Sequence, residues 1–215
     1  MSSFTLKILA IIFMTIDHIG FLLFPEISIL RKIGRLAFPI FAFQVGIGFK
    51  HTRSKEKYIF RMLLFTLISQ LPYTLALQTA IPGYAYKLNI GATLTLGLLA
   101  LYCIEKFGNK WLKYLTCISI ILISAWIPID YGWTGVLMIV ILYYLNKEKL
   151  LVSAYYIALI CIDSQIDNST FNLPQIFALI PMLMYNGKKG PNIKYLFYAF
   201  YPVHLIVLVL LKGMW

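Results

Sequence analysis

Two ionisable side chains stand next to each other in an apolar run near the start of the chain, Asp17 and His18 in FMTIDHIGFLLF. A neutral imidazole can accept a proton near physiological pH, and a neighbouring carboxylate can orient the imidazole or balance a nearby cation. The pair therefore predicts proton-transfer chemistry, with His18 as general base and Asp17 as its support.

Two basic residues, Arg31 and Arg35, follow one short hairpin later and share a helical face. Arg35 is the expected counter-ion of Asp17, and its guanidinium can also hold a carbonyl oxygen or a developing oxyanion. The structural alternative is an Asp17–Arg35 pair with His18 bonded to a backbone carbonyl. Neighbouring helical residues point about 100° apart, so we expect one of Asp17 and His18 to face a cavity and the other to tie helices together.

A second histidine, His204, lies in the apolar run FYAFYPVHLIVL near the end of the chain. Pro202 removes the backbone hydrogen bond that would reach Tyr198 and so opens the helix just before His204. His204 is therefore either part of a site wall or a helix-packing histidine. A metal site from Asp17, His18 and His204 is disfavoured because the set lacks cysteine and His-x-x-x-His spacing, and no metal is expected.

The composition indicates an integral membrane protein. Of the 215 residues, 60% are hydrophobic and 13% are charged, which is outside the range of soluble domains. Apolar blocks of transmembrane length predict an all-α, polytopic helix bundle that forms one domain over residues 1–215. Nine transmembrane helices are expected near 6–24, 28–49, 58–80, 88–106, 111–129, 133–146, 149–163, 173–186 and 194–212.

The loops predict how the bundle is oriented. KHTRSKEKY, EKFGNKWLK, NKEK and NGKKGPNIK are rich in Lys and Arg, whereas PEIS, IPGYAY, IPIDYG and DSQIDNSTFN are nearly free of them. Basic loops remain in the cytoplasm, so the N-terminus is expected inside and the C-terminus outside. Topology and anionic membrane lipid then account for much of the net charge of +11, and no nucleic-acid partner is needed.

Two of the basic loops also have features of a phosphate site. Arg53 and Arg61 lie in FKHTRSKEKYIFR, and Lys188 and Lys189 lie between glycines in YNGKKGPNIKY. Glycine allows the backbone to approach a ligand closely, and basic side chains bind phosphate oxygens. The positive-inside rule alone also predicts Lys and Arg at these positions, so both readings remain open.

Four segments of the sequence together resemble the TraX family of bacterial membrane proteins, which is associated with N-terminal acetylation of conjugative pilin. They run in order from the first span to the last: LKILAIIFMTIDHIGFLLFP, LRKIGRLAFPIFAFQVGIGFKHTRSKEKYIFRMLLFTLISQLPY, MYNGKKG and FYAFYPVHL. RLAFPIFAF and YPVHL are more faintly similar to motifs of the wider transmembrane acyltransferase superfamily. The chain departs from many family members in having Gln70 in place of an acidic residue. It also matches poorly over 107–172, which we expect to set the acceptor.

This resemblance implies a transmembrane acyltransferase-like protein of the bacterial inner membrane. It would use cytoplasmic acetyl-CoA to acetylate an amine or hydroxyl of an external peptide, glycan or small molecule. The implied catalytic residues are His18 as base, Arg35 as its cationic partner, and Asp17 and His204 in support. The implied donor-binding residues are Arg31, Arg53, Arg61, Lys188 and Lys189, with the pantetheine arm between helices. The alternative is a proton-coupled transporter or flippase with the same ionisable groups near the midplane, and a purely structural role ranks third.

Overall fold

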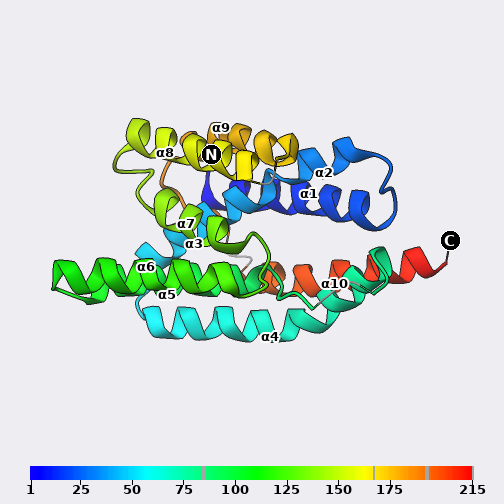
Figure 1. Ribbon diagram of the computed structural model, residues 1–215, viewed down its shortest axis with the longest axis horizontal. Helices are drawn as coiled ribbons and strands as arrows, with labels where there is room; N and C mark the ends of the chain where they lie inside the picture. The colour runs from blue at the N-terminus through cyan, green and yellow to red at the C-terminus, as the bar shows by residue number, and fades with distance from the viewer. Residues whose placement is uncertain (84–85, 167, 192–193, 215) are drawn as a thin grey trace.

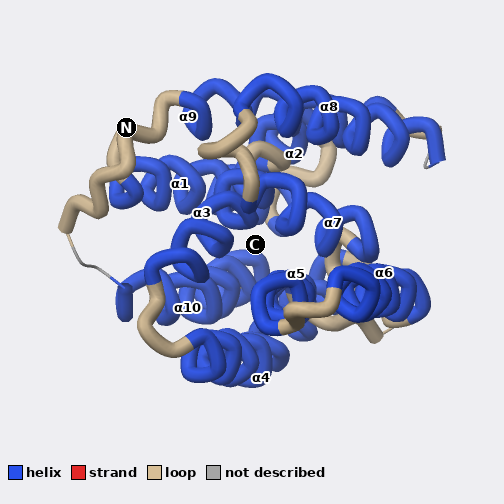
Figure 2. Tube along the Cα trace, turned by 90° about the vertical axis from the view of Figure 1, so that its left-hand side faces the viewer, coloured by secondary structure: helices blue, strands red, loops and turns tan. Residues whose placement is uncertain are grey.

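The computed structural model describes residues 1–83, 86–166, 168–191 and 194–214, and the described part of the chain is built from helices and short connections (Figure 1). A layer of α4, α5, α6 and α10 packs below a layer of α1, α2, α8 and α9, with α3 and α7 between the layers (Figure 2). The helices are α1 (Ser3–Leu22), α2 (Ser28–Gly34), α3 (Ala37–His51), α4 (Lys55–Ala80), α5 (Ile90–Lys106), α6 (Lys110–Trp126), α7 (Gly132–Tyr143), α8 (Lys149–Ile166), the 3₁₀ helix η1 (Thr170–Ala178), α9 (Leu179–Leu183) and α10 (Lys194–Gly213).

The prediction of an all-helical bundle is confirmed, and each of the nine predicted segments has a helical counterpart. Two segments are divided where one continuous helix was expected. The segment 28–49 breaks between Gly34 and Ala37 into α2 and α3, and the segment 173–186 consists of η1 and α9. Pro174 lies inside η1, where its missing N–H disfavours a regular α-helix.

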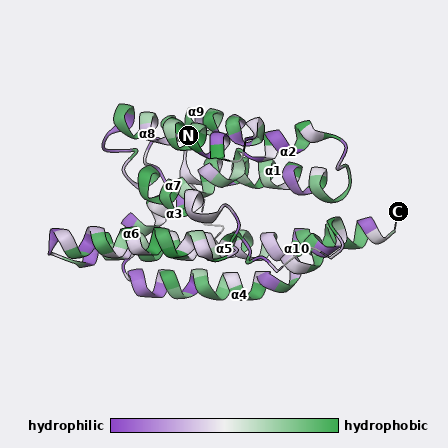
Figure 3. Ribbon diagram, in the orientation of Figure 1, coloured by the Kyte–Doolittle hydropathy of each residue, from purple (hydrophilic) through white to green (hydrophobic). Residues whose placement is uncertain are grey.

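The lengths and surfaces of the helices are those of a membrane protein. Within the described ranges, five segments are long and apolar enough to cross a membrane: α1, the combined α2 and α3, α4, α8 and Tyr195–Gly213. Hydrophobic residues cover much of the helix surfaces (Figure 3), and on α4 the outward-facing Leu67, Ile68 and Leu71 are all more than 60% exposed. In water such an apolar surface would cause the protein to aggregate, whereas in a bilayer it contacts lipid chains.

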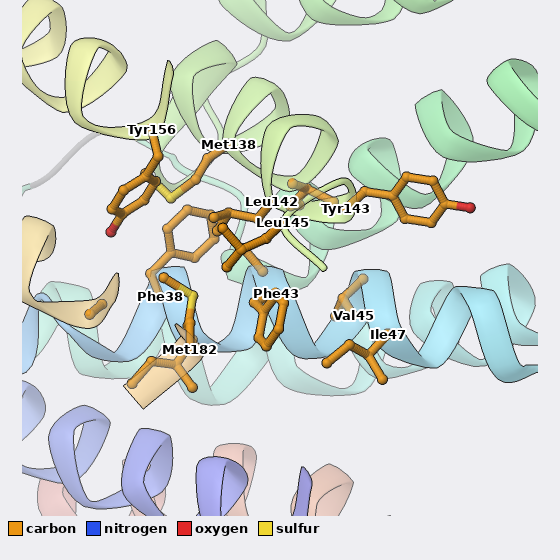
Figure 4. Close-up of a cluster of buried hydrophobic side chains, with 14 of the residues drawn as sticks. Phe38, Phe43, Val45, Ile47, Met138, Leu142, Tyr143, Leu145, Tyr156 and Met182 are labelled. Carbon is orange, nitrogen blue, oxygen red and sulfur yellow. The ribbon is translucent and has the colours of Figure 1, made fainter. Parts of the chain in front are cut away.

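Helix α3 is the centre of the bundle. It packs against α1, α5, α7 and η1, and its side chains Phe38, Ile40, Phe43 and Phe49 are at most 2% exposed. Figure 4 shows Phe38 and Phe43 meeting Leu142 of α7 in the main buried cluster. A helix buried on all sides must be apolar on all sides, and AFPIFAFQVGIGF has a single polar residue, Gln44.

The basic loops gather at one end of the bundle. The connections α3–α4, α5–α6 and α7–α8 all lie at the left end in Figure 1, and the chain ends at the right. The N-terminal turn joins the basic loop before α10, because Ser3 N donates to Lys188 O at 2.8 Å and Phe4 N donates to Lys189 O at 3.0 Å. The structure thus has the separation of charge that the positive-inside rule requires, and the side that faces the cytoplasm stays a prediction.

Orientation can be tested with single cysteines at two exposed loop positions, Glu26 and Asn146. In a variant whose natural Cys103, Cys117 and Cys161 are replaced by alanine, a membrane-impermeant maleimide should label Glu26→Cys in intact spheroplasts. Asn146→Cys should react only after the membrane is permeabilised, because it lies in a basic loop. The opposite pattern would invert the bundle.

Helices α1 and α2 approach each other most closely at Gly34. A Cβ atom at this position would lie 2.2 Å from Cβ and 2.5 Å from Cα of Asp17. We expect Gly34→Ala to force the two helices apart and to lower the free energy of unfolding by about 1–3 kcal/mol, as overpacking does. Gly108→Ala is the control, since nothing lies within 4 Å of a Cβ there. Thermal unfolding in detergent should separate the two variants, and equal stability would contradict the close approach.

Candidate functional site

A cavity of about 340 Å³ collects the ionisable side chains that the sequence placed in apolar runs. Asp17 and His18 from α1, Arg31 from α2 and Arg35 from the α2–α3 turn all line it. The expectation that only one of Asp17 and His18 faces a cavity is wrong, because both do. They nevertheless have different partners, as their different directions on the helix require.

Asp17 is held between two guanidinium groups. Its Oδ2 lies 3.5 Å from Arg31 Nη1, and its Oδ1 lies 3.9 Å from Arg35 Nε. These distances are longer than hydrogen bonds, and both Asp17 Oδ1 and Arg35 Nε are buried without a hydrogen-bond partner among the described residues. Asp17 therefore balances the charge of the arginines, while the hydrogen-bonding capacity of Arg35 Nε is not met by the described residues.

Tyr131 fixes the position of Arg35 from the other side. Arg35 Nη1 donates to the Tyr131 hydroxyl at 3.2 Å, and the Tyr131 ring stacks on Phe38 with centroids 3.9 Å apart. Tyr131 has φ +60°, a left-handed conformation that is costly for a bulky residue and concentrates at functional sites. No sequence pattern points to Tyr131, because an aromatic residue in a short loop is ordinary.

The opposite wall of the cavity contains a second charge pair that the sequence analysis missed. Lys87 and Asp130 both line the cavity, and Lys87 Nζ lies 3.2 Å from Asp130 Oδ1. Gln70 holds the Lys87 loop, since its Nε2 donates to Lys87 O at 2.9 Å and its Oε1 accepts from Asn89 N at 3.0 Å. An ionised acid could only accept, so it could not donate to the Lys87 carbonyl as the Gln70 amide does.

The two histidines of the membrane spans form a chain of hydrogen bonds. His18 Nδ1 lies 2.7 Å from His204 Nε2, and His204 Nδ1 lies 2.8 Å from Phe200 O. A carbonyl oxygen only accepts, so His204 Nδ1 carries the hydrogen and the neutral ring accepts at Nε2 from His18 Nδ1–H. His18 Nε2 is then the nitrogen with the free lone pair.

The hydrogen bonds bear on the structural alternative for His18. His204 bonds the backbone carbonyl, and His18 bonds His204, so the part of that alternative in which His18 bonds a backbone carbonyl is wrong, whereas its Asp17–Arg35 pair is present. His204 is 8% exposed and stands behind His18, away from the cavity lining. His18 thus lines the cavity, and its ring is oriented by the hydrogen bond to His204.

The predicted donor-binding residues fall into two groups. Arg31 lies in the cavity beside Asp17, whereas Arg53, Lys188 and Lys189 are exposed in loops at the basic end. Arg61 is part-buried on α4 with its guanidinium 5.6 Å from the Tyr58 ring. Arg31 is therefore separated from the other four by its place in the fold.

A second cavity of about 160 Å³ lies between the basic end and the first cavity. It is lined by residues near the basic ends of α1, α3 and α4, among them Lys7, Gln44 and Tyr58. Four residues line both cavities: Phe41, Phe65, Leu94 and Phe197. The two cavities therefore adjoin through an apolar wall. Across the described ranges, no group of three or more His, Cys, Asp or Glu side chains is placed to hold a metal ion.

The protonation of His18 can be measured directly, since the chain has only 3 histidines. In ¹⁵N-histidine-labelled protein at neutral pH, NMR should show His18 protonated at Nδ1 and unprotonated at Nε2, because His204 accepts from Nδ1. His204→Leu removes that acceptor and should shift the His18 Nδ1 resonance, while His51→Gln, in an exposed position, should not. A hydrogen on His18 Nε2 would contradict the assignment.

Comparison with known proteins places the chain in a family. The family described as TraX protein matches residues 2–212. A probable fimbrial assembly protein FimC, serogroup H1, of Dichelobacter nodosus is 31% identical over 96% of this chain and 94% of its own length. The uncharacterized protein RP591 of Rickettsia prowazekii (strain Madrid E) is 30% identical over 84% of this chain and 68% of its own length.

A third relative carries the family name itself. Protein TraX of Escherichia coli is 26% identical over 94% of this chain and 84% of its own length. No solved structure matches the chain. The match to the family over nearly the whole sequence confirms the resemblance drawn from the ionisable residues and prolines of the first and last spans, and the chain belongs to the TraX family.

Proposed function

We propose that this protein is a membrane-embedded acetyltransferase that takes the acyl group from acetyl-CoA at the basic end of the bundle. The acceptor is an amine or hydroxyl that enters the first cavity from the opposite end. One observation carries the proposal: His18, with a free lone pair on Nε2, and Arg35, whose Nε has no hydrogen-bond partner among the described residues, line the same cavity. A base and a cation facing one space are what acyl transfer from a thioester requires.

The cavity residues can carry out this transfer in one proton cycle. His18 Nε2 takes the proton of the acceptor N–H or O–H as the acceptor atom bonds to the thioester carbonyl carbon. Arg35 holds the carbonyl oxygen as negative charge develops on it. The carbon–sulfur bond then breaks, and His18 returns the proton to the leaving thiolate. Asp17 and Tyr131 keep the guanidinium in place, and His204 keeps the imidazole in the required tautomer.

The second cavity supports entry of the donor from the basic end. Lys7 lines this cavity and His18 lines the first, and they lie on one helix, about 16 Å apart at the rise of an α-helix. Exposed Arg53, Lys188 and Lys189 at the basic end suit the phosphates of CoA. The thioester would reach His18 while the nucleotide stays outside the bundle, so the whole donor need not cross the membrane.

Three residues in or beside the first cavity support a role for the middle of the chain in choosing the acceptor. Asp130 and Tyr131 line the first cavity, and Phe171 lies against Arg35, 5.0 Å from its guanidinium. All three come from 107–172, the region that the sequence analysis expects to set the acceptor. Because the Dichelobacter relative is named for fimbrial assembly, an amine of a surface protein is the first acceptor class to test, ahead of glycans and small metabolites.

Catalysis is tested by removing the base and the cation separately. His18→Ala and Arg35→Ala should each lower the rate of acetyl transfer, or of acetyl-CoA hydrolysis until an acceptor is found, by about 10²–10⁴. CoA binding should remain in His18→Ala, because the imidazole acts on the acceptor. His51→Ala is the matched control, a histidine exposed at the basic end, and thermal unfolding must show that all three variants fold.

Two outcomes would overturn the proposal. A folded His18→Ala protein with near-full transfer activity would show that another group is the base. Wild-type protein that binds no CoA in a detergent that preserves the fold would instead favour the transporter reading, in which the same ionisable groups relay protons.

A further inference from the structure

Gln44 is the one polar residue in the buried run of α3, and only one of the two polar atoms of its side-chain amide has a hydrogen-bond partner. The side chain is 5% exposed and lines the second cavity. Ser3 Oγ donates to Gln44 Oε1 at 2.6 Å, whereas Gln44 Nε2 has no hydrogen-bond partner in the described part of the protein. Buried polar groups without partners are rare in folded proteins and need an explanation.

A structural role does not account for this amide. The Ser3 hydroxyl connects α1 to α3 through the acceptor oxygen alone, and an aliphatic side chain would pack in an apolar helix without an unmet donor. A hydrogen-bond donor held in the wall of a cavity indicates a ligand with an acceptor.

The position and shape of the cavity limit what that ligand is. The cavity lies between the basic end and the cavity of His18, and aromatic and aliphatic residues form most of its wall. The cavity has a volume of only about 160 Å³, so a slender chain fits it better than a bulky group. Lys7 lines the same cavity with its ammonium 5.3 Å from the Phe197 ring, which favours a ligand that is anionic at one end.

We propose that the second cavity binds the pantetheine arm of the acyl donor and that Gln44 Nε2 donates to one of the arm's amide carbonyls. The inference rests on the proposed function and adds a residue to it. The arm is a slender chain with amide acceptors and an anionic nucleotide at one end, so it meets all three requirements. A hydrocarbon chain would leave the Gln44 amide unpaired.

The test compares ligands with and without the arm. Calorimetric titration in detergent would use CoA, S-acetylpantetheine, which is the acylated arm alone, and 3′-phospho-ADP, which is the nucleotide alone. Gln44→Leu should weaken binding of CoA and S-acetylpantetheine roughly tenfold, the effect of one buried hydrogen bond, and leave 3′-phospho-ADP unchanged. Gln44→Glu keeps an acceptor for Ser3 and, when ionised, has no donor, so at a pH where it is ionised it should weaken the same two ligands at least as much.

Ser3→Ala is the matched control, because it removes the other bond of Gln44 and keeps Nε2. It should bind all three ligands within about threefold of wild type. Wild-type affinity for CoA in both Gln44 variants would overturn the inference and leave the proposed function standing. Equal weakening of all three ligands would also overturn it, since the amide would then act through the fold. If wild-type protein binds none of the ligands, the proposed function fails and the inference fails with it.

Discussion

The charge of Asp17 is the constraint around which this bundle is arranged. An unpaired carboxylate within a membrane costs about 2.5–3.5 kcal/mol on insertion scales, and here two guanidinium groups face it. To bring them there, α2 must pass α1 at backbone distance, which only the missing side chain of Gly34 allows. One carboxylate between two arginines leaves a surplus positive charge, so the cluster is complete only when another negative group arrives. A developing oxyanion is such a group.

A site residue can be predicted from the sequence where its type is energetically costly at that position, and not where its type is ordinary. Asp17, His18, Arg31 and His204 stand in or beside apolar runs, where an ionisable side chain is costly and therefore informative. The structure joins them through two short chains of contacts. Lys87, Asp130 and Tyr131 are in loops, where polar residues are ordinary, and the two loops are brought together by the Leu88–Ile129 bridge and the Lys87–Asp130 ion pair. No local pattern predicts that long-range pairing.

The fold likewise has features that a local sequence pattern predicts and features that depend on contacts between distant segments. Apolar length sets the number and order of the helices, and these could be predicted. The break after Gly34 has a local signal, because Pro39 in RLAFPIFAF cannot donate to the carbonyl of Arg35. The close contact of Gly34 with Asp17 of α1 has none. The basic loops predict topology and phosphate binding equally well. Only the structure separates Arg31, which lies with Asp17, from the basic residues of the loops.

The wall between the two cavities bears on the choice between transfer and transport. Phe41, Phe65, Leu94 and Phe197 line both cavities and place only apolar surface between the polar groups on either side. A proton or ion relay needs polar groups or water along its whole path, and these four side chains interrupt it. A slender arm that carries a thioester needs only space between apolar side chains, and it loses little by leaving water there. The same wall that opposes a leak of protons across the membrane is therefore compatible with the proposed passage of an acyl group from one cavity to the other.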